Sequence, residues 1–118
     1  MTTSLRIATL LSALLFLGYG SLVLISGAMR SEFERFGLPH LRRVTGALEV
    51  LGGLGLLVGL LSPAILVVSS GGLAFLMLLG VITRIRVRDR LLDSVPAAAL
   101  MVLNGSILVV AVRLIGAS

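Results

Sequence analysis

Residues 7–29, IATLLSALLFLGYGSLVLISGAM, form an unbroken stretch of 23 positions without a charged side chain. At about 1.5 Å per residue, a helix of this length crosses the roughly 30 Å hydrocarbon core of a bilayer. A secretory signal has a shorter apolar region, about 7–15 residues, that ends at small residues. We therefore interpret this stretch as a retained membrane-spanning helix, expected over about residues 5–29.

Two more long uncharged stretches follow, from Glu49 to Arg84 and from Asp93 to Arg113. Of the 118 residues, 58% are hydrophobic and 13% are charged, and this charged share is about half that of a soluble domain. One small core cannot bury so much apolar surface. The sequence therefore predicts an integral membrane protein with a single domain, residues 1–118.

A break at Ser62-Pro63 divides the first of these stretches, because proline disfavours helical geometry in the residue before it. We expect three further helices, over about residues 44–61, 63–83 and 95–115. The second and third loops are short and the first is longer, and loops of these lengths suit helices that alternate in direction. The predicted fold class is all-α, a membrane-spanning up-down-up-down four-helix bundle.

The basic residues, all arginine, predict the orientation of the chain. The first and third loops carry eight of them: Arg30, Arg35, Arg42, Arg43, Arg84, Arg86, Arg88 and Arg90. The other side carries Arg6 and Arg113. By the positive-inside rule, loops one and three lie in the cytoplasm and both termini lie outside the cell membrane.

Several classes of function are disfavoured by composition. The chain has no cysteine, which excludes disulfides and thiolate metal sites, and its one histidine, His40, is too little for a metal site. Aromatic residues are 4% of the chain and tryptophan is absent, so nucleic acid is not an expected partner. No phosphate-cradling loop, hydrolase triad or zinc-protease motif is present, so no catalytic residue is predicted and a non-enzymatic role is favoured.

Glu49 is the residue most indicative of function, because it lies about 9 Å inside a predicted spanning helix. An acid there needs a partner, a proton or water. Gly52 and Gly53, one turn away, leave room for a ligand or for a neighbouring helix. Tyr19 and Asn104 are expected at a similar depth, so the five residues form the candidate ligand site. The alternative is a neutralised or paired acid that fixes helix register.

The remaining motifs have plainer interpretations. The third-loop arginines, Arg84, Arg86, Arg88 and Arg90, are expected to contact lipid headgroups, with an acidic partner as the alternative. Gly55 and Gly59 form a small-xxx-small pair that favours close helix packing. Its partner is either the next helix, at Gly71-Gly72, or a second copy of the chain, so a homo-oligomer stays open.

Four segments together resemble the DoxX-like family of small four-helix membrane proteins. They are Gly27-Ala-Met-Arg30, Phe36-Gly-Leu-Pro39, the glycine-rich Glu49–Gly59 segment, and a charged third loop that leads to Val95-Pro96. The resemblance covers nearly the whole chain, and it makes Arg30, Gly37, Pro39 and Glu49 family-type positions. It implies a membrane subunit or accessory protein, with some relatives linked to quinone-coupled thiosulfate oxidation and others to oxidative-stress complexes or chaperone-like roles.

Three functions compete on these observations. The first is an accessory or redox-associated subunit that holds a hydrophobic ligand, a quinone or a lipid, near Glu49. The second is a small proton-coupled multidrug-type transporter, although proteins of that type carry their essential glutamate in the first helix, where this chain has none. The third is a purely structural assembly factor bound to another membrane subunit. Neither the residues nor the resemblance identifies a cofactor.

Overall fold

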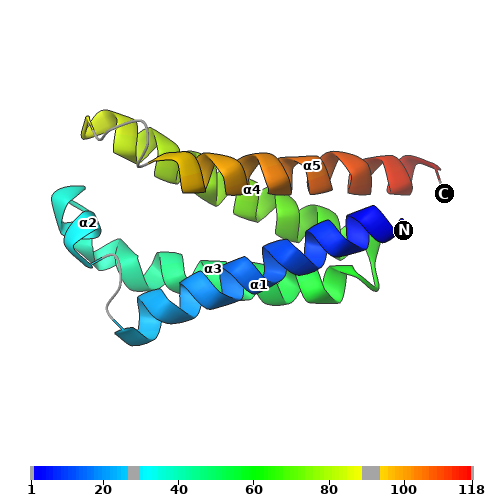
Figure 1. The fold of residues 1–118 in the computed structure, drawn as a ribbon, viewed down its shortest axis with the longest axis horizontal. Helices are drawn as coiled ribbons and strands as arrows, with labels where there is room; N and C mark the ends of the chain where they lie inside the picture. Colours follow the sequence, from blue (N-terminus) through cyan, green and yellow to red (C-terminus); the bar gives the residue numbers. More distant parts are fainter. Residues whose placement is uncertain (1, 27–29, 89–93, 118) are drawn as a thin grey trace.

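The computed structural model describes residues 2–26, 30–88 and 94–117, and all regular structure within them is helical. The elements are α1 (Thr3–Ser26), α2 (Arg30–Arg35), the 3-10 helix η1 (Pro39–Leu41), α3 (Arg42–Gly59), α4 (Pro63–Arg86) and α5 (Val95–Ala117). Figure 1 shows the long helices running back and forth between two ends. We call the end where α1 begins and α5 finishes the terminus end, and the end that holds α2 and the finish of α4 the loop end.

Local side-chain chemistry explains where the helices begin. The hydroxyl of Thr2 accepts a 3.2 Å hydrogen bond from the backbone N–H of Leu5, so α1 starts at Thr3, two residues before the expected start. Pro63 occupies the first position of α4, where its missing N–H costs nothing. The helix expected over 44–61 is observed at Arg42–Gly59, and the one expected to finish at 83 continues to Arg86.

The first loop is ordered by a helix-terminating turn at Gly37. This glycine has a φ of +76°, the left-handed conformation that glycine adopts at little cost. Its N–H donates to the carbonyl of Glu34 at 3.0 Å, and the N–H of Leu38 donates to the carbonyl of Phe33 at 2.9 Å. This pair of bonds is a Schellman motif, which closes the last turn of α2 and directs the chain into η1.

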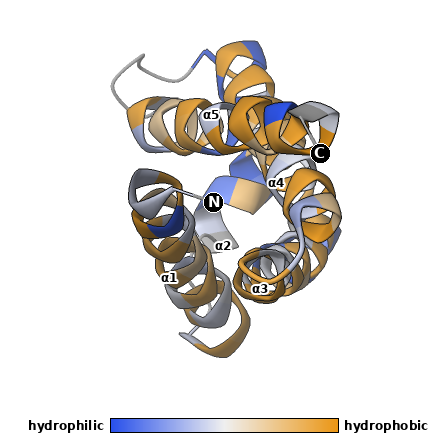
Figure 2. Ribbon diagram, turned by 90° about the vertical axis from the view of Figure 1, so that its right-hand side faces the viewer, coloured by the Kyte–Doolittle hydropathy of each residue, from blue (hydrophilic) through white to orange (hydrophobic). Residues whose placement is uncertain are grey.

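The helices pack mainly as two pairs, α1 with α3 and α4 with α5, and the pairs meet through α3–α4 and α1–α5 contacts. Figure 2 shows this arrangement along the bundle. The α1–α3 contact depends on small residues: a Cβ at Gly20 would lie 2.8 Å from the carbonyl oxygen of Gly46. The buried apolar core consists of Leu5, Ala13, Phe16, Leu56, Leu66, Leu73, Met77, Ile107 and Ala111.

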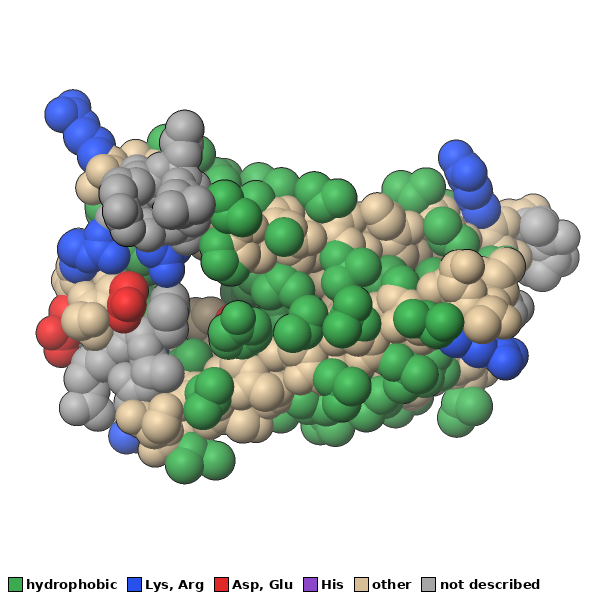
Figure 3. Space-filling model, viewed as in Figure 1, with side chains coloured by type: hydrophobic (Ala, Val, Ile, Leu, Met, Phe, Trp, Pro, Cys, Tyr) green, Lys and Arg blue, Asp and Glu red, His purple; other side chains and the backbone are tan. Residues whose placement is uncertain are grey.

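The exterior of the bundle is apolar, which confirms a membrane protein class. Three helices, α1, α4 and α5 up to Gly116, are long and apolar enough to cross a bilayer, and only 33%, 22% and 17% of their most apolar windows is buried inside the protein. Figure 3 shows hydrophobic side chains over the middle of the molecule and arginines at both ends. Such a surface suits lipid and would be unusual in water.

The remaining long helix, α3, differs from the other three in composition. Its 18 residues include three charged side chains, Arg42, Arg43 and Glu49, so it is less apolar than α1, α4 and α5. Two of these charges are nevertheless largely withdrawn from the surface, since Arg42 is 7% and Glu49 is 9% exposed. α3 packs against α1 and α4, and apolar side chains such as Leu48 and Leu51 remain exposed on its outer surface.

Candidate functional site

Glu49 is held in the interior of the bundle, on the buried side of α3. Its Oε2 atom is buried and has no hydrogen-bond partner within the described residues. An unpaired carboxylate in apolar surroundings is costly, so such a group needs a proton, water or a polar ligand. The structure therefore contains a hydrogen-bonding group whose capacity the described chain does not use.

Two faces of α3 define the direction of Glu49. One face packs on α1, where a Cβ at Gly46 would lie 3.0 Å from Cγ1 of Val23. Another face packs on α4, where a Cβ at Gly59 would lie 2.8 Å from Cα of Leu66. Gly46 lies three positions before Glu49 and Gly59 ten positions after it, which is about 60° to one side and about 80° to the other around the helix, so Glu49 projects between these two contacts. Its carboxyl is consequently directed toward the middle of the bundle.

Gly52 and Gly53 serve helix packing in this structure. A Cβ at Gly52 would overlap the side chain of Leu73, and one at Gly53 would lie 2.9 Å from Cγ of Leu17. The space beside both glycines is thus filled by neighbouring helices, one of the two uses that the sequence left open. The pair Gly55 and Gly59 likewise packs within the chain against α4, although at Ser69 and Leu66 rather than at Gly71-Gly72.

The prediction that Tyr19, Glu49 and Asn104 meet inside the bundle is wrong for Tyr19, which is 50% exposed. The helix stripe that contains Ser12 drifts by about 20° in seven residues, and this drift carries Tyr19 out of the buried face. Asn104 is fully buried, as expected, but its Oδ1 accepts a 2.9 Å hydrogen bond from Ser12.

Asn104 and Glu49 also lie at different levels of the bundle. A Cβ at Gly20 would lie 3.1 Å from Cβ of Glu49, which places Glu49 beside Gly20 on α1. Ser12, the partner of Asn104, is eight residues earlier on α1, or about 12 Å along the helix axis. Glu49 is therefore nearer the loop end, and Asn104 belongs to a separate interhelical contact.

Arg42, at the start of α3, is occupied by the end of α1. Its Nη1 donates a hydrogen bond to the backbone carbonyl of Val23, one of the last four carbonyls of α1. The carbonyls near the end of a helix carry the negative end of its dipole, so a buried cation is favourable there. Arg42 thus completes α1 and is not the counter-ion of Glu49.

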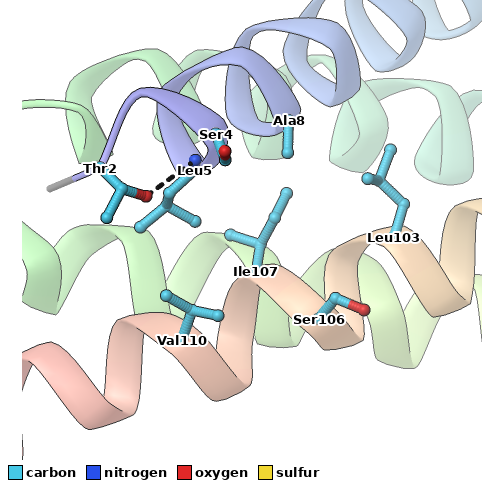
Figure 4. Close-up of a pocket in the computed structure, with 8 residues that line it drawn as sticks. All are labelled: Thr2, Ser4, Leu5, Ala8, Leu103, Ser106, Ile107 and Val110. Atoms are coloured by element: carbon cyan, nitrogen blue, oxygen red, sulfur yellow. Dashed lines mark hydrogen bonds between the residues drawn. The ribbon is translucent and has the colours of Figure 1, made fainter.

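Among the described residues, neither of the following two surface grooves is lined by Glu49. A groove of about 200 Å³ lies between α1 and α5 near the terminus end, where Figure 4 shows Leu5 and Ile107 directed toward each other. A groove of about 380 Å³ lies between α3 and α4 and is lined by Leu48, Leu51, Gly52, Val68, Ser69, Gly72, Leu73, Phe75, Leu76 and Leu79. Both grooves are mainly apolar and lie in the lipid-facing surface.

Within the described residues, no group of three or more His, Cys, Asp or Glu side chains could hold a metal ion. The single histidine, His40, is exposed.

Comparison with known protein families is decisive for the class of this chain. A family model described as the DoxX-like family matches residues 7–112. The chain belongs to the DoxX-like family. Comparisons with curated proteins and with solved structures gave no match.

The DoxX-like loop motif Phe36-Gly-Leu-Pro39 has a clear structural role. Gly37 supplies the left-handed residue that ends α2, and Pro39 is the first residue of η1, which leads directly into α3. The motif therefore sets the register at which α3 enters the bundle. Arg30 begins α2, but its side chain, like that of Pro39, lies outside the described part of the structure.

The third-loop arginines of this DoxX-like protein differ in their solvent exposure. Arg84 is half-buried, with its guanidinium carbon 5.4 Å from the centre of the Phe36 ring. Arg86 and Arg88 are exposed, and Arg90 lies outside the described residues. Arg88 has a φ of +59° and follows the end of α4, a position where glycine is more usual.

Sequence reasoning missed three features near this interior. From the sequence alone, Arg42 is interpreted only as an indicator of membrane orientation, because no sequence pattern pairs it with Val23 on another helix. The contact of Phe36 with Arg84 joins distant segments in the same way. Thr9 is fully buried with its hydroxyl oxygen unpartnered among the described residues, and threonine in an apolar run gives no signal of that kind.

Proposed function

We propose that this DoxX-like protein is an accessory or redox-associated membrane subunit that holds a hydrophobic ligand, a quinone or a lipid, beside Glu49. The observation that carries the proposal is the buried and unpartnered Oε2 of Glu49. A ligand carbonyl or hydroxyl beside this carboxyl would share a hydrogen bond with it. The apolar interior would accept the rest of such a molecule.

The proposal includes four membrane crossings, with α3 as the second. At 18 residues, α3 is about 27 Å long, close to the thickness of the hydrocarbon core. Its charges do not forbid this placement, because Arg42 lies at the loop end of the helix and Glu49 faces the interior. The neighbouring helices α1 and α4 then cover part of α3, while its exposed apolar side chains, such as Leu51 and Leu54, would face lipid.

The proposed orientation puts the loop end in the cytoplasm and both termini outside. The described arginines of loops one and three lie at the loop end, whereas Arg6, near the start of α1, and Arg113, near the end of α5, lie toward the terminus end. This asymmetry follows the positive-inside rule. In this orientation Glu49 is reached from the cytoplasmic half of the bilayer, since it lies about 10 Å from the start of α3.

The proposal is tested by measuring what the protein binds in lipid nanodiscs. Wild-type protein is titrated with a decyl-substituted benzoquinone, and molecules retained through purification are identified by mass spectrometry. We expect saturable binding of the quinone or a retained lipid. Glu49→Leu, which removes the hydrogen-bonding group, should weaken binding by about tenfold, equivalent to about 1.4 kcal/mol.

Asn104→Leu is the matched control, because it also removes a buried polar group but at the other level of the bundle. It should leave ligand affinity within about twofold of wild type. Equal losses in both variants would mean that general loosening of the bundle, rather than Glu49, governs binding. Absence of any saturable or retained ligand in the wild type would reject the proposal in favour of a structural assembly role.

A further inference from the structure

The contact between α3 and α4 opens progressively from the terminus end toward the loop end. At Gly59 the two backbones touch, since a Cβ there would lie 2.8 Å from Cα of Leu66. Further along, Gly52 is covered by the side chain of Leu73. Beyond that point, a Cβ at Gly80 would meet nothing within 4 Å. Figure 1 shows the α1–α3 and α4–α5 pairs diverging in the same direction.

This open space adjoins the interior that contains Glu49. Gly80 follows Leu73 by seven residues and Thr45 precedes Gly52 by seven, so both continue the facing stripes of α4 and α3. Continuing the same antiparallel register places Thr45 opposite Gly80. Glu49 lies one turn further inside on α3. The surface in Figure 3 is also hollowed near this end, between the two helix pairs.

An aromatic–arginine contact spans the two pairs at the mouth of this space. The guanidinium carbon of Arg84, on the inner stripe of α4 one turn beyond Gly80, lies 5.4 Å from the centre of the Phe36 ring. Arg35 lies over the same ring at 5.3 Å, and Phe33 packs edge-on against it at 5.8 Å. The turn at Gly37 fixes the ring in this position.

We propose that the contact between Phe36 and Arg84 is a latch that closes the loop-end mouth of this inner space, and that its opening admits an amphipathic ligand to Glu49. The ligand would come from the headgroup level of the bilayer, where Arg84 lies, rather than sideways through the apolar α3–α4 groove. The ligand part of this inference rests on the proposed function, whereas the latch does not.

A cysteine reporter tests the latch without any ligand. Because the chain has no cysteine of its own, Thr45→Cys gives a single thiol facing the inner space. Its reaction with a charged, membrane-impermeant maleimide is timed in nanodiscs, which expose both membrane faces to the reagent. When labelling requires a transient opening, its rate follows the population of the open form.

Breaking the latch should speed this labelling. Phe36→Ala and Arg84→Gln are each expected to raise the rate about fivefold, which corresponds to about 1 kcal/mol, the size of an exposed cation–π contact. The double variant should be no faster than either single variant, since both remove the same contact. Arg86→Gln, which removes a neighbouring exposed arginine, should leave the rate unchanged.

A second reporter, Ser70→Cys, separates opening of the mouth from loss of fold. Ser70 is fully buried and lies nearer the terminus end of α4, so its labelling should stay slow in every latch variant. If latch variants leave the Thr45→Cys rate within twofold of wild type, or speed Ser70→Cys equally, the latch is wrong. If the latch variants respond as expected but no quinone or lipid binds at Glu49, the latch stands and the proposed function fails.

Discussion

The hydroxyl of Ser12 in α1 donates a 2.9 Å hydrogen bond to Oδ1 of Asn104 in α5, and both side chains are fully buried. The amide nitrogen of Asn104 donates in turn to the carbonyl of Leu100 at 2.9 Å, so both ends of the amide are satisfied. In surroundings without water, these groups have few other partners. The pair therefore links the first and last helices of the chain across the bundle.

Substituting the two residues singly and together should reveal a coupled pair. Ser12→Ala and Asn104→Ala should each destabilise the protein, and the double variant should cost less than the sum by about 0.6 kcal/mol, a typical membrane value. Reversible unfolding by detergent titration measures these free energies. Ser106→Ala is the control, because its exposed hydroxyl bonds only to its own helix. Strictly additive losses would show that the pair makes no independent contribution.

The close approach of α1 and α3 predicts a strong effect at Gly20. A Cβ there would lie 2.8 Å from both the carbonyl oxygen of Gly46 and Cγ2 of Val50. Because the oxygen belongs to the backbone, the helices must separate, and we expect Gly20→Ala to cost about 1–3 kcal/mol of unfolding free energy. Gly105→Ala, where a Cβ meets nothing within 4 Å, should be near neutral in the same assay.

The turn at Gly37 predicts a local effect on the first loop. Any other L-residue at its φ of +76° is strained by roughly 1–2 kcal/mol, so Gly37→Ala should weaken the turn that ends α2. Hydrogen exchange followed by mass spectrometry should show faster exchange of the amides of Gly37→Ala protein at Leu38 and its neighbours. Gly37→Asn should be milder, because asparagine tolerates this conformation. Unchanged exchange in the alanine variant would contradict the role of the turn.

Arg42 and Arg43 predict opposite outcomes for two adjacent charges. Arg42 is buried and bonded to Val23, whereas Arg43 is exposed. Arg42→Leu should lower the unfolding free energy by about 1.5–3 kcal/mol, the range for a hydrogen bond to a charged group, and Arg43→Leu should change it by less than about 0.5 kcal/mol. Thermal unfolding of both variants in nanodiscs checks this. Equal losses of unfolding free energy in both variants would mean that net charge, rather than the hydrogen bond from Arg42 to Val23, determines this contribution to stability.

Much of the fold follows from hydropathy and from a few residues that begin or end helices. Long uncharged stretches and the break before Pro63 located the membrane helices, since lipid requires continuous apolar helices. The start of α1 was missed by two residues because Thr2, a suitable N-cap, lies outside the apolar stretch. In the first loop, the glycine of the Gly-Leu-Pro segment predicts a turn, which the structure places at the end of α2, whereas the 3-10 helix η1 has no signal in the sequence.

The candidate site was only partly accessible to sequence reasoning. The burial of Glu49 was predictable, because a single acid in an apolar helix is directed inward. Tyr19 was misplaced because it lies seven residues after the buried Ser12, and seven residues keep a common helix face only approximately, so a small drift exposes Tyr19 at the edge of that face. The contact of Arg84 with Phe36 depends on how two loops meet, and no periodicity within either segment encodes that meeting.

The carbonyl of Val23 receives its partner from Arg42, 19 positions later in the chain. During synthesis, α1 therefore emerges from the ribosome before the side chain that completes its last turn exists. A helical hairpin containing both segments is the smallest nascent unit in which the hydrogen bond from Arg42 to Val23 can form. We accordingly expect the translocation machinery to release α1 and α3 into the bilayer together rather than one after the other.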